Sequence, residues 1–357
     1  MEKKKDLIGK VITVLGLING QELGFTHPHE HLLIDMSVYF TEPSEASVRV
    51  LAHQLVTLET LGWIRYNTRY NIDCQCLNDE SIAIEELMRF KLAGGKTLVE
   101  LTSKGIGRDP LALARISRAT GVNVVMGAGY YIAASHSPEI ASMTEEQIAE
   151  ELITDMRYGV GNTGVRAGII GEIGCSWPLQ DSEKKVLRAS AMAQQETGVA
   201  INIHPSRNED GPIEVIEVLR EAGARLNKVV ISHMDRCGYL LDTRLKILEA
   251  GAYVEYDVFG KEGYYPAEAA LSDGHLPDMP NDVGRIKQIS ELIEKGYLKQ
   301  ILISQDTCMK IDLRRWGGPG YSHIIDNVIP LMNVYGFNKE QIDILTIDNP
   351  RTMLTIS

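Results

Sequence analysis

Short apolar runs alternate with helix-length amphipathic segments along most of the chain. Seven of these runs lie at residues 96–102, 122–129, 167–174, 199–205, 228–235, 252–259 and 300–306, and a histidine-rich stretch at 24–35 precedes them. Strands that are nearly all apolar and alternate with helices are typical of a parallel sheet covered by helices. Eight such units predict an α/β fold of the (β/α)8 TIM barrel type.

Helical periodicity and stop signals separate these runs. Helices are expected near 181–197, 213–222, 240–250 and 281–295, and Gly121, Gly198, Gly223 and Gly251 stand where a helix should end. A doubly wound open sheet is the alternative, but no glycine-rich phosphate-binding motif opens the first unit. Because no linker or low-complexity segment interrupts the pattern, we expect residues 1–357 to form a single domain.

Three segments lie outside the barrel pattern. Residues 11–15 and 22–25 flank Asn19-Gly20, a sequence typical of tight turns, which predicts a short N-terminal β-hairpin. Residues 36–78 and 307–321 are longer than barrel connections need to be. Because barrel enzymes place substrate contacts on the loops that follow the strands, both long segments are expected to border the active site.

Composition and charge narrow the class of protein. The net charge of −12 argues against a nucleic-acid partner, whose binding surface would be basic. The basic N-terminus lacks a signal-cleavage site, and no apolar run reaches the ~18 residues that a membrane span needs. Five scattered cysteines (Cys74, Cys76, Cys175, Cys237 and Cys308) are typical of reduced thiols. We therefore expect a soluble, cytoplasmic protein.

Metal-competent side chains stand late in several apolar runs. His29 and His31 lie two residues apart in the first run, and His204, His233 and Asp306 each follow a run of apolar residues. Glu172 stands late in the fourth run. One such histidine alone is more often structural, but six of these groups at the same end of one barrel would be a costly cluster without a cation. The pattern predicts a metal site.

The same residues carry a family resemblance. The stretches at 24–31, 168–174, 203–204, 232–235 and 304–306 together resemble the phosphotriesterase family of the amidohydrolase superfamily. The similarity runs from Val11 to about Thr352, and the segments 168–179 and 317–323 place it closest to the phosphotriesterase-related branch. Members of this family are metal-dependent hydrolases, so the resemblance implies the same activity here.

The resemblance also implies a binuclear site, with zinc the expected metal and manganese, cobalt or iron as alternatives. By matching motif, His29, His31 and Asp306 would hold the more buried ion, and His204 and His233 the more exposed one. The best-known members bridge the two ions with a carboxylated lysine on the fourth strand, but residues 167–174 contain no lysine. Glu172, one residue beyond that position, is therefore assigned as the bridge. If Glu172 is not the bridge, it instead supports the ligands of a site that holds a single metal ion.

The implied reaction is hydrolysis of an ester, lactone or amide bond by a hydroxide that bridges the two ions. Zinc lowers the pKa of bound water to about 7, so such a hydroxide forms near neutral pH. Asp306 would be ligand and catalytic base, relaying the proton toward the leaving group. A phosphoric ester hydrolase, such as a phosphotriesterase or phosphodiesterase, and a non-catalytic small-molecule-binding barrel are the alternatives. A homodimer is expected from the resemblance alone.

The substrate is expected to be small and anionic, because cationic residues follow several strand ends. An arginine offers two parallel donors to a carboxylate, sulfonate or phosphate. Aromatic residues near the third and eighth strands could wall the pocket. The residues expected to contact the substrate are Tyr130, Tyr131, Arg207, Arg236, Asp257, Lys261 and Trp316.

Overall fold

A parallel sheet of eight strands forms the centre of the molecule. The computed structural model describes residues 4–236, 239–261 and 279–357. The strands follow the order β12-β11-β10-β9-β8-β7-β6-β3, which is nearly closed as a barrel. They are β3 (Thr26–Glu30), β6 (Thr97–Glu100), β7 (Asn123–Ala128), β8 (Ile169–Gly174), β9 (Ile201–His204), β10 (Val229–Ile231), β11 (Tyr253–Tyr256) and β12 (Ile301–Ile303). Each lies within one of the eight predicted runs, so the predicted barrel is confirmed.

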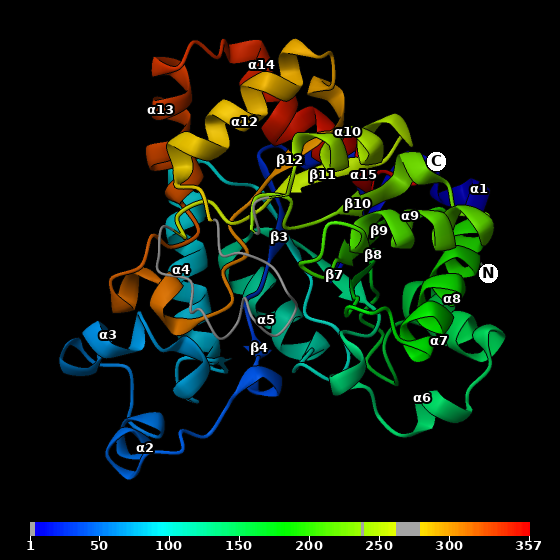
Figure 1. Cartoon of the computed structure of the whole chain (residues 1–357). Coiled ribbons are helices and arrows are strands. Elements are labelled where there is room, and N and C mark those ends of the chain that lie inside the picture. Colours follow the sequence, from blue (N-terminus) through cyan, green and yellow to red (C-terminus); the bar gives the residue numbers. More distant parts are fainter. Residues whose placement is uncertain (1–3, 237–238, 262–278) are drawn as a thin grey trace.

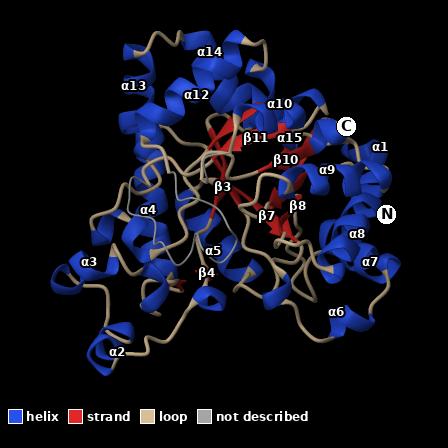
Figure 2. Ribbon diagram, in the orientation of Figure 1, coloured by secondary structure: helices blue, strands red, loops and turns tan. Residues whose placement is uncertain are grey.

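Helices surround this sheet on the outside (Figures 1 and 2). They are α1 (Lys4–Leu7), α2 (Ala46–Ala52), α3 (Leu58–Ile64), α4 (Glu80–Ala93), α5 (Pro110–Thr120), α6 (Glu139–Ser142), α7 (Glu145–Arg157), α8 (Asp181–Thr197), α9 (Gly211–Glu221), α10 (Leu241–Glu249), α12 (Asp282–Glu294), α13 (Ile329–Val334), α14 (Lys339–Asp343) and α15 (Asn349–Leu354). The predicted glycine stops are present. Gly121 and Gly198 cap α5 and α8 in the left-handed conformation that glycine adopts readily. None of the described helices combines the length and apolarity needed to cross a bilayer.

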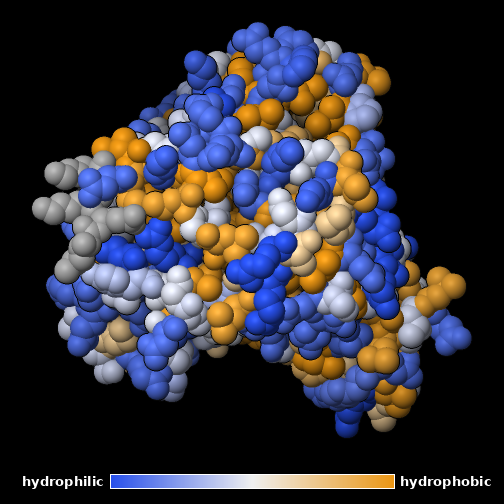
Figure 3. All heavy atoms as spheres, turned by 180° about the vertical axis from the view of Figure 1, so that it is seen from behind, coloured by the Kyte–Doolittle hydropathy of each residue, from blue (hydrophilic) through white to orange (hydrophobic). Residues whose placement is uncertain are grey.

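Alternation along each strand separates two apolar layers. Val99, Val125, Val230 and Leu302 belong to one buried cluster that includes residues from most of the strands. Their sequence neighbours, such as Leu98 and Ile231, belong to a second cluster together with helix residues. The first cluster therefore fills the barrel interior and the second joins the sheet to the helices, as in other TIM barrels. The surface seen from behind mixes hydrophilic and hydrophobic residues (Figure 3).

The N-terminal hairpin exists, but the prediction placed its turn wrongly. Strand β1 (Lys10–Thr13) pairs antiparallel with β2 (Gly16–Asn19), so the turn lies between Thr13 and Gly16. Asn19-Gly20 instead opens a short 3-10 helix, Gly20–Glu22. The Asn19 side chain accepts a hydrogen bond from Gln21 N, and the Glu22 carboxylate accepts one from Asn19 N. This reciprocal cap stabilises a helix start where the dipeptide suggested a turn.

The long segment between β3 and β6 forms a lobe beside the barrel. It contains α2 and α3, which lie at the lower left of Figure 1, and a two-strand pairing of β4 (Ile34–Asp35) with β5 (Cys76–Leu77). Four cysteines are free thiols, while Cys237 lies outside the described residues. The lobe and the loop after β12 both border the pocket described below, as predicted from their length.

Candidate metal centre and substrate pocket

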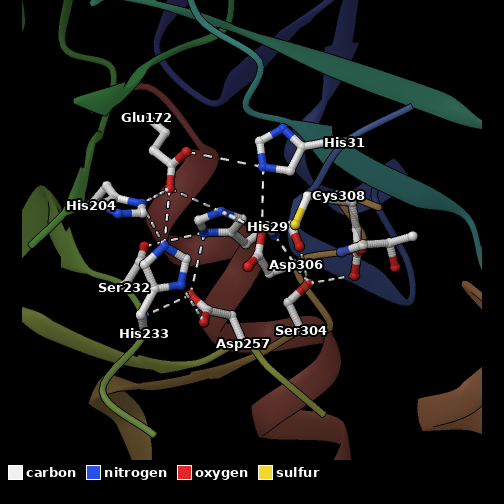
Figure 4. Close-up of polar contacts among 12 residues, drawn as sticks. His29, His31, Glu172, His204, Ser232, His233, Asp257, Ser304, Asp306 and Cys308 are labelled. Atoms are coloured by element: carbon white, nitrogen blue, oxygen red, sulfur yellow. Dashed lines mark hydrogen bonds and ion pairs between the residues drawn. The ribbon is translucent and has the colours of Figure 1, made fainter. Parts of the chain in front are cut away.

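Six side chains converge at the carboxyl ends of the barrel strands (Figure 4). His29 lies in β3 and His31 directly after it, Glu172 lies in β8 and His204 ends β9. His233 and Asp306 follow β10 and β12. These are the six residues that the sequence analysis grouped as metal ligands. They form two clusters that could each hold a cation, His29/His31/Asp306 and Glu172/His204/His233, and a third such group, His29/His233/Asp257, shares one residue with each.

Glu172 stands at the centre of the cluster. Its Oε2 lies 2.7 Å from His204 Nδ1 and 3.0 Å from His233 Nε2. The same oxygen lies 3.4 Å from His29 Nε2, and Oε1 lies 4.0 Å from His31 Nε2. One carboxylate therefore faces all four imidazoles, with its two oxygens turned to different histidines.

Asp306 divides its two oxygens between different partners. Oδ1 lies 3.4 Å from His31 Nε2 and 3.7 Å from His29 Nε2. Oδ2 accepts a hydrogen bond from Lys261 Nζ at 3.2 Å. Burial would raise the pKa of Asp306, but Lys261 and the nearby histidines outweigh it and hold the pKa well below its usual range. Asp306 is therefore a carboxylate with one oxygen turned to His29 and His31.

The donor set fits divalent metal ions. Two ligand atoms bound to one zinc ion at about 2.1 Å lie about 3.4 Å apart at tetrahedral angles; this is the separation between His31 and Asp306. His29 Nε2 is buried and has no hydrogen-bond partner among the described residues, although it points into the cluster. Burial lowers the pKa of His204 to about 3, which favours the neutral imidazole that binds metal.

Two bulges aim side chains of β8 and β3 into the cluster. Between Ile170 and Ile173 the partner strand β9 advances by only two residues, from Ile201 to Ile203. β8 therefore carries one extra residue, and this solves the register problem that the sequence posed for Glu172. Gly171 lies in the bulge with φ of +137°, and a Cβ there would approach Asn202 O to 2.5 Å. β3 is irregular in the same way between His27 and Glu30.

His233 and Asp306 adopt left-handed backbone conformations, with φ of +58° and +48°. Such conformations are uncommon outside glycine and concentrate at functional sites. Hydrogen bonds hold both in place: His233 N donates to Asp257 Oδ2 at 2.9 Å, and Asp306 N donates to His29 O at 3.2 Å. The backbone strain therefore lies at His233 and Asp306, two of the six converging residues.

A second layer of polar groups orients the imidazoles. Asp257 Oδ1 lies 2.7 Å from His233 Nδ1, and Glu255 Oε2 lies 3.2 Å from His29 Nδ1. Thr102 Oγ1 lies 2.9 Å from His31 Nδ1. Burial would raise the pKa of Asp257, but His233 and His29 outweigh it and hold the pKa below its ordinary value. Carboxylates that hydrogen-bond the far nitrogen of a ligand histidine fix its tautomer and orientation.

A pocket of about 530 Å³ opens above the cluster, and His31, Glu172, His204 and Asp306 form part of its lining. Within the described part of the chain, five cationic side chains also line it: Arg65, Arg69, Arg207, Arg236 and Lys261. Arg236 Nη1 lies 3.2 Å from His204 Nε2. The walls of the pocket include Tyr39 and Tyr131, whose hydroxyls lie 3.1 Å apart. The Tyr131 hydroxyl also lies 3.2 Å from His204 Nδ1.

Four of the seven predicted substrate contacts border this pocket, namely Tyr131, Arg207, Arg236 and Lys261. The other three do not line it. Asp257 is buried beneath His233, and the Tyr130 ring packs on Lys104. Trp316 packs against Lys310 and Arg315. Their contacts are with other parts of the protein or, for Asp257, with His233. The prediction differed because a position at a strand end does not by itself determine which way the side chain turns.

Sequence reasoning missed several residues of the site. Glu255 precedes Asp257 by two residues on the same strand face, so period-two alternation was an available signal. Tyr39, Arg65 and Arg69 come from the lobe between β3 and β6, where no periodic pattern pointed to the pocket.

Comparison with known proteins places the chain in a family. The model of the phosphotriesterase family matches residues 9–354, and the chain belongs to that family. It is 41% identical to the N-acetyltaurine hydrolase of Dictyostelium discoideum, covering 98% of each chain. It is 40% identical to a phosphotriesterase-related protein of Nematostella vectensis, covering 97% of this chain and 99% of that one. These matches confirm the predicted family and branch, and the chain is a hydrolytic enzyme.

Among solved structures, the fold is similar to that of a resiniferatoxin-binding protein from Rhodobacter sphaeroides. The TM-score is 0.92 at 33% sequence identity, and the match covers 100% of this chain and 99% of the other.

Proposed function

We propose that this protein is a binuclear metal-dependent hydrolase that cleaves the amide bond of a small N-acyl amine carrying an anionic group, with N-acetyltaurine as the first substrate to test. The observation that carries the proposal is the convergence of four imidazoles and two carboxylates on one point of a cation-lined pocket. The name of the Dictyostelium relative supports an amide substrate with a sulfonate group. Zinc is the expected metal, with manganese, cobalt and iron as alternatives.

Each of the six residues has a part in holding the ions. His29, His31 and Asp306 would hold one, His204 and His233 the other, and Glu172 would bridge them, because its two oxygens face different histidines. When bound, two such ions activate water and polarise the oxygen of the scissile group. The mixed histidine and carboxylate donors suit a hydrolytic centre better than a closed structural one.

Asp306 is the proposed catalytic base. Its Oδ1 faces the ligand histidines, so it can accept a proton from the attacking water at that side. The leaving amine must be protonated to depart, and a carboxylate that has taken up a proton can return it to the nitrogen. Lys261 holds Oδ2, so the carboxylate cannot rotate away during this exchange.

The cationic lining favours an anionic substrate. The whole chain has a net charge of −12, yet among the residues that the structure describes five cations and only three carboxylates line the pocket. Two of these carboxylates, Glu172 and Asp306, belong to the metal cluster, and Asp312 lies 3.6 Å from Lys261 Nζ. Arg207 and Arg236, on the loops after β9 and β10, are the proposed partners of a sulfonate or carboxylate.

Small-molecule binding beside hydrolysis is the second candidate function, because the Rhodobacter structure of high similarity is named for binding. An ester substrate and a phosphoric ester remain further alternatives for the bond. The homodimer and the cytoplasmic location stay predictions, which sedimentation velocity and fractionation of the source cells would check.

Hydrolysis by the metal-loaded enzyme tests the proposal. The panel compares N-acetyltaurine and N-acetyl-β-alanine with the neutral amide N-butylacetamide, an aryl acetate and an aryl phosphotriester. It follows release of the amine from the amides and of the phenol from the two esters. The proposal expects the highest kcat/KM with the anionic amides and loss of turnover after chelation. Saturable binding of N-acetyltaurine with full metal loading and no turnover on any compound would refute the proposed reaction.

A further inference from the structure

The barrel closes at a seam between its first and last strands, β3 and β12. Within the described residues, ladder pairing joins the strands in sequence from β12 round to β3, and no ladder links these two ends. Single hydrogen bonds cross the seam instead. His29 N donates to Ser304 Oγ at 3.1 Å, and Asp306 N donates to His29 O at 3.2 Å.

The Glu30 carboxylate spans this seam. Its Oε1 accepts a hydrogen bond from Gln305 N, and its Oε2 accepts one from Thr307 N, both at 2.9 Å. The Ser304 hydroxyl lies 2.9 Å from Oε1. The two backbone donors belong to the residues on either side of Asp306, so one side chain fixes both flanks of that ligand.

Glu30 is itself held rigidly. It is fully buried, and His27 Nδ1 lies 2.9 Å from its Oε1. The His27 ring in turn packs on Phe90, with ring centroids 4.7 Å apart. A carboxylate with this many partners cannot change rotamer without losing several buried hydrogen bonds.

We propose that Glu30 is a positioning residue for Asp306. Its carboxylate holds the backbone on both sides of Asp306 and so keeps Asp306 in its left-handed conformation. Glu30 thereby sets the distance across the seam between Asp306 and the His29/His31 pair. This inference rests on the proposed metal centre. The three residues would hold one ion, and they come from opposite sides of a seam that lacks a ladder. Glu30 therefore prepares this half of the site before an ion binds.

The test compares Glu30→Gln with Glu86→Gln. Glutamine keeps the size of Glu30 but replaces one acceptor oxygen with a donor, so one backbone N–H beside Asp306 loses its partner. Glu86 is a matched control, because it too is buried and accepts hydrogen bonds from two successive backbone N–H groups, Arg314 N and Arg315 N, on the same loop. Ser304→Ala is a milder second variant should Glu30→Gln fail to fold.

The main readout is metal affinity, measured by competition with a chromophoric chelator, beside the melting temperature with and without metal. Removing a residue that orients a ligand typically weakens metal affinity by about 10- to 100-fold, and we expect such a loss for one of the two ions in Glu30→Gln. Ser304→Ala should lower the affinity for the same ion by a smaller factor. Glu86→Gln should keep the affinity of the unsubstituted protein for both ions, even where its melting temperature falls.

Unchanged metal affinity in Glu30→Gln and Ser304→Ala would overturn the inference while leaving the proposed function standing. So would an equal loss in Glu86→Gln, because the effect would then be general destabilisation. If the unsubstituted protein binds no metal, both the inference and the proposed function fail.

Discussion

Replacing Glu172 by glutamine removes the carboxylate on which the four histidines converge. The substitution keeps the shape of the side chain but removes its negative charge. Glutamine also turns two N–H donors toward imidazole nitrogens that lie 2.7 Å and 3.0 Å from the present oxygen. We expect a folded protein that has lost its bridge between the two ions.

The size of the loss follows from these two close contacts. A hydrogen bond or ligand contact to a charged group contributes about 1.5–3 kcal/mol, so two lost contacts correspond to about 3–6 kcal/mol. Since about 1.4 kcal/mol changes an equilibrium constant tenfold, affinity for the second ion should fall by about 100- to 10,000-fold. The metal content of Glu172→Gln should therefore drop from two ions to one after dialysis.

Inductively coupled plasma mass spectrometry of the dialysed protein measures this ratio. Glu183→Gln is the matched control, because Glu183 is buried and accepts hydrogen bonds from Ala133 N and Ser176 N, away from the histidine cluster. Two ions per chain in Glu172→Gln would refute the bridging role, and loss of metal in Glu183→Gln would attribute the effect to destabilisation.

Asp306→Asn should lower kcat for amide hydrolysis by about 100- to 10,000-fold, the range for loss of a general base; near-normal turnover would remove Asp306 from the proton relay. Arg207→Ala should raise KM for N-acetyltaurine by about tenfold or more, the effect of one lost charge-assisted contact. KM for N-butylacetamide should not change, and neither should KM in the control Arg315→Ala, because Arg315 lies outside the pocket lining. An equal rise in KM for the neutral amide would contradict anion recognition. Burial lowers the pKa of Lys228 from 10.5 to about 8, so the unfolded chain holds the proton more tightly than the folded protein does. The free energy of unfolding should therefore rise by about 3 kcal/mol between pH 8 and 10.5. Denaturant titrations of Lys228→Met should show no such rise, and an unchanged dependence of the unfolding free energy on pH would show that other groups cause it.

The barrel, and the convergence of six polar side chains at its rim, could be predicted because their signals are local. Each strand is a short apolar run, and His204, His233 and Asp306 follow such runs directly. The carboxyl ends of parallel strands meet at one rim, so position in the chain determined position in space. Glu172 required a bulge in β8, and its side chain still reached the cluster.

Residues that support the ligands could not be found in this way, because their contacts join distant parts of the chain. Glu255 meets His29, and Glu30 meets Thr307, across most of the sequence length. Tyr39 reaches the pocket from a lobe whose conformation depends on its own packing. The hairpin turn was misplaced for the opposite reason: a local cap at Asn19 outweighed the usual preference of the dipeptide.

The central claim is that two metal ions lie on either side of Glu172. Anomalous diffraction from crystals of the metal-loaded protein, collected at the absorption edge of the bound metal, tests it most directly. We expect two peaks about 3.5–4 Å apart, one beside His29, His31 and Asp306 and the other beside His204 and His233. A single peak, or peaks that Glu172 does not touch, would contradict it.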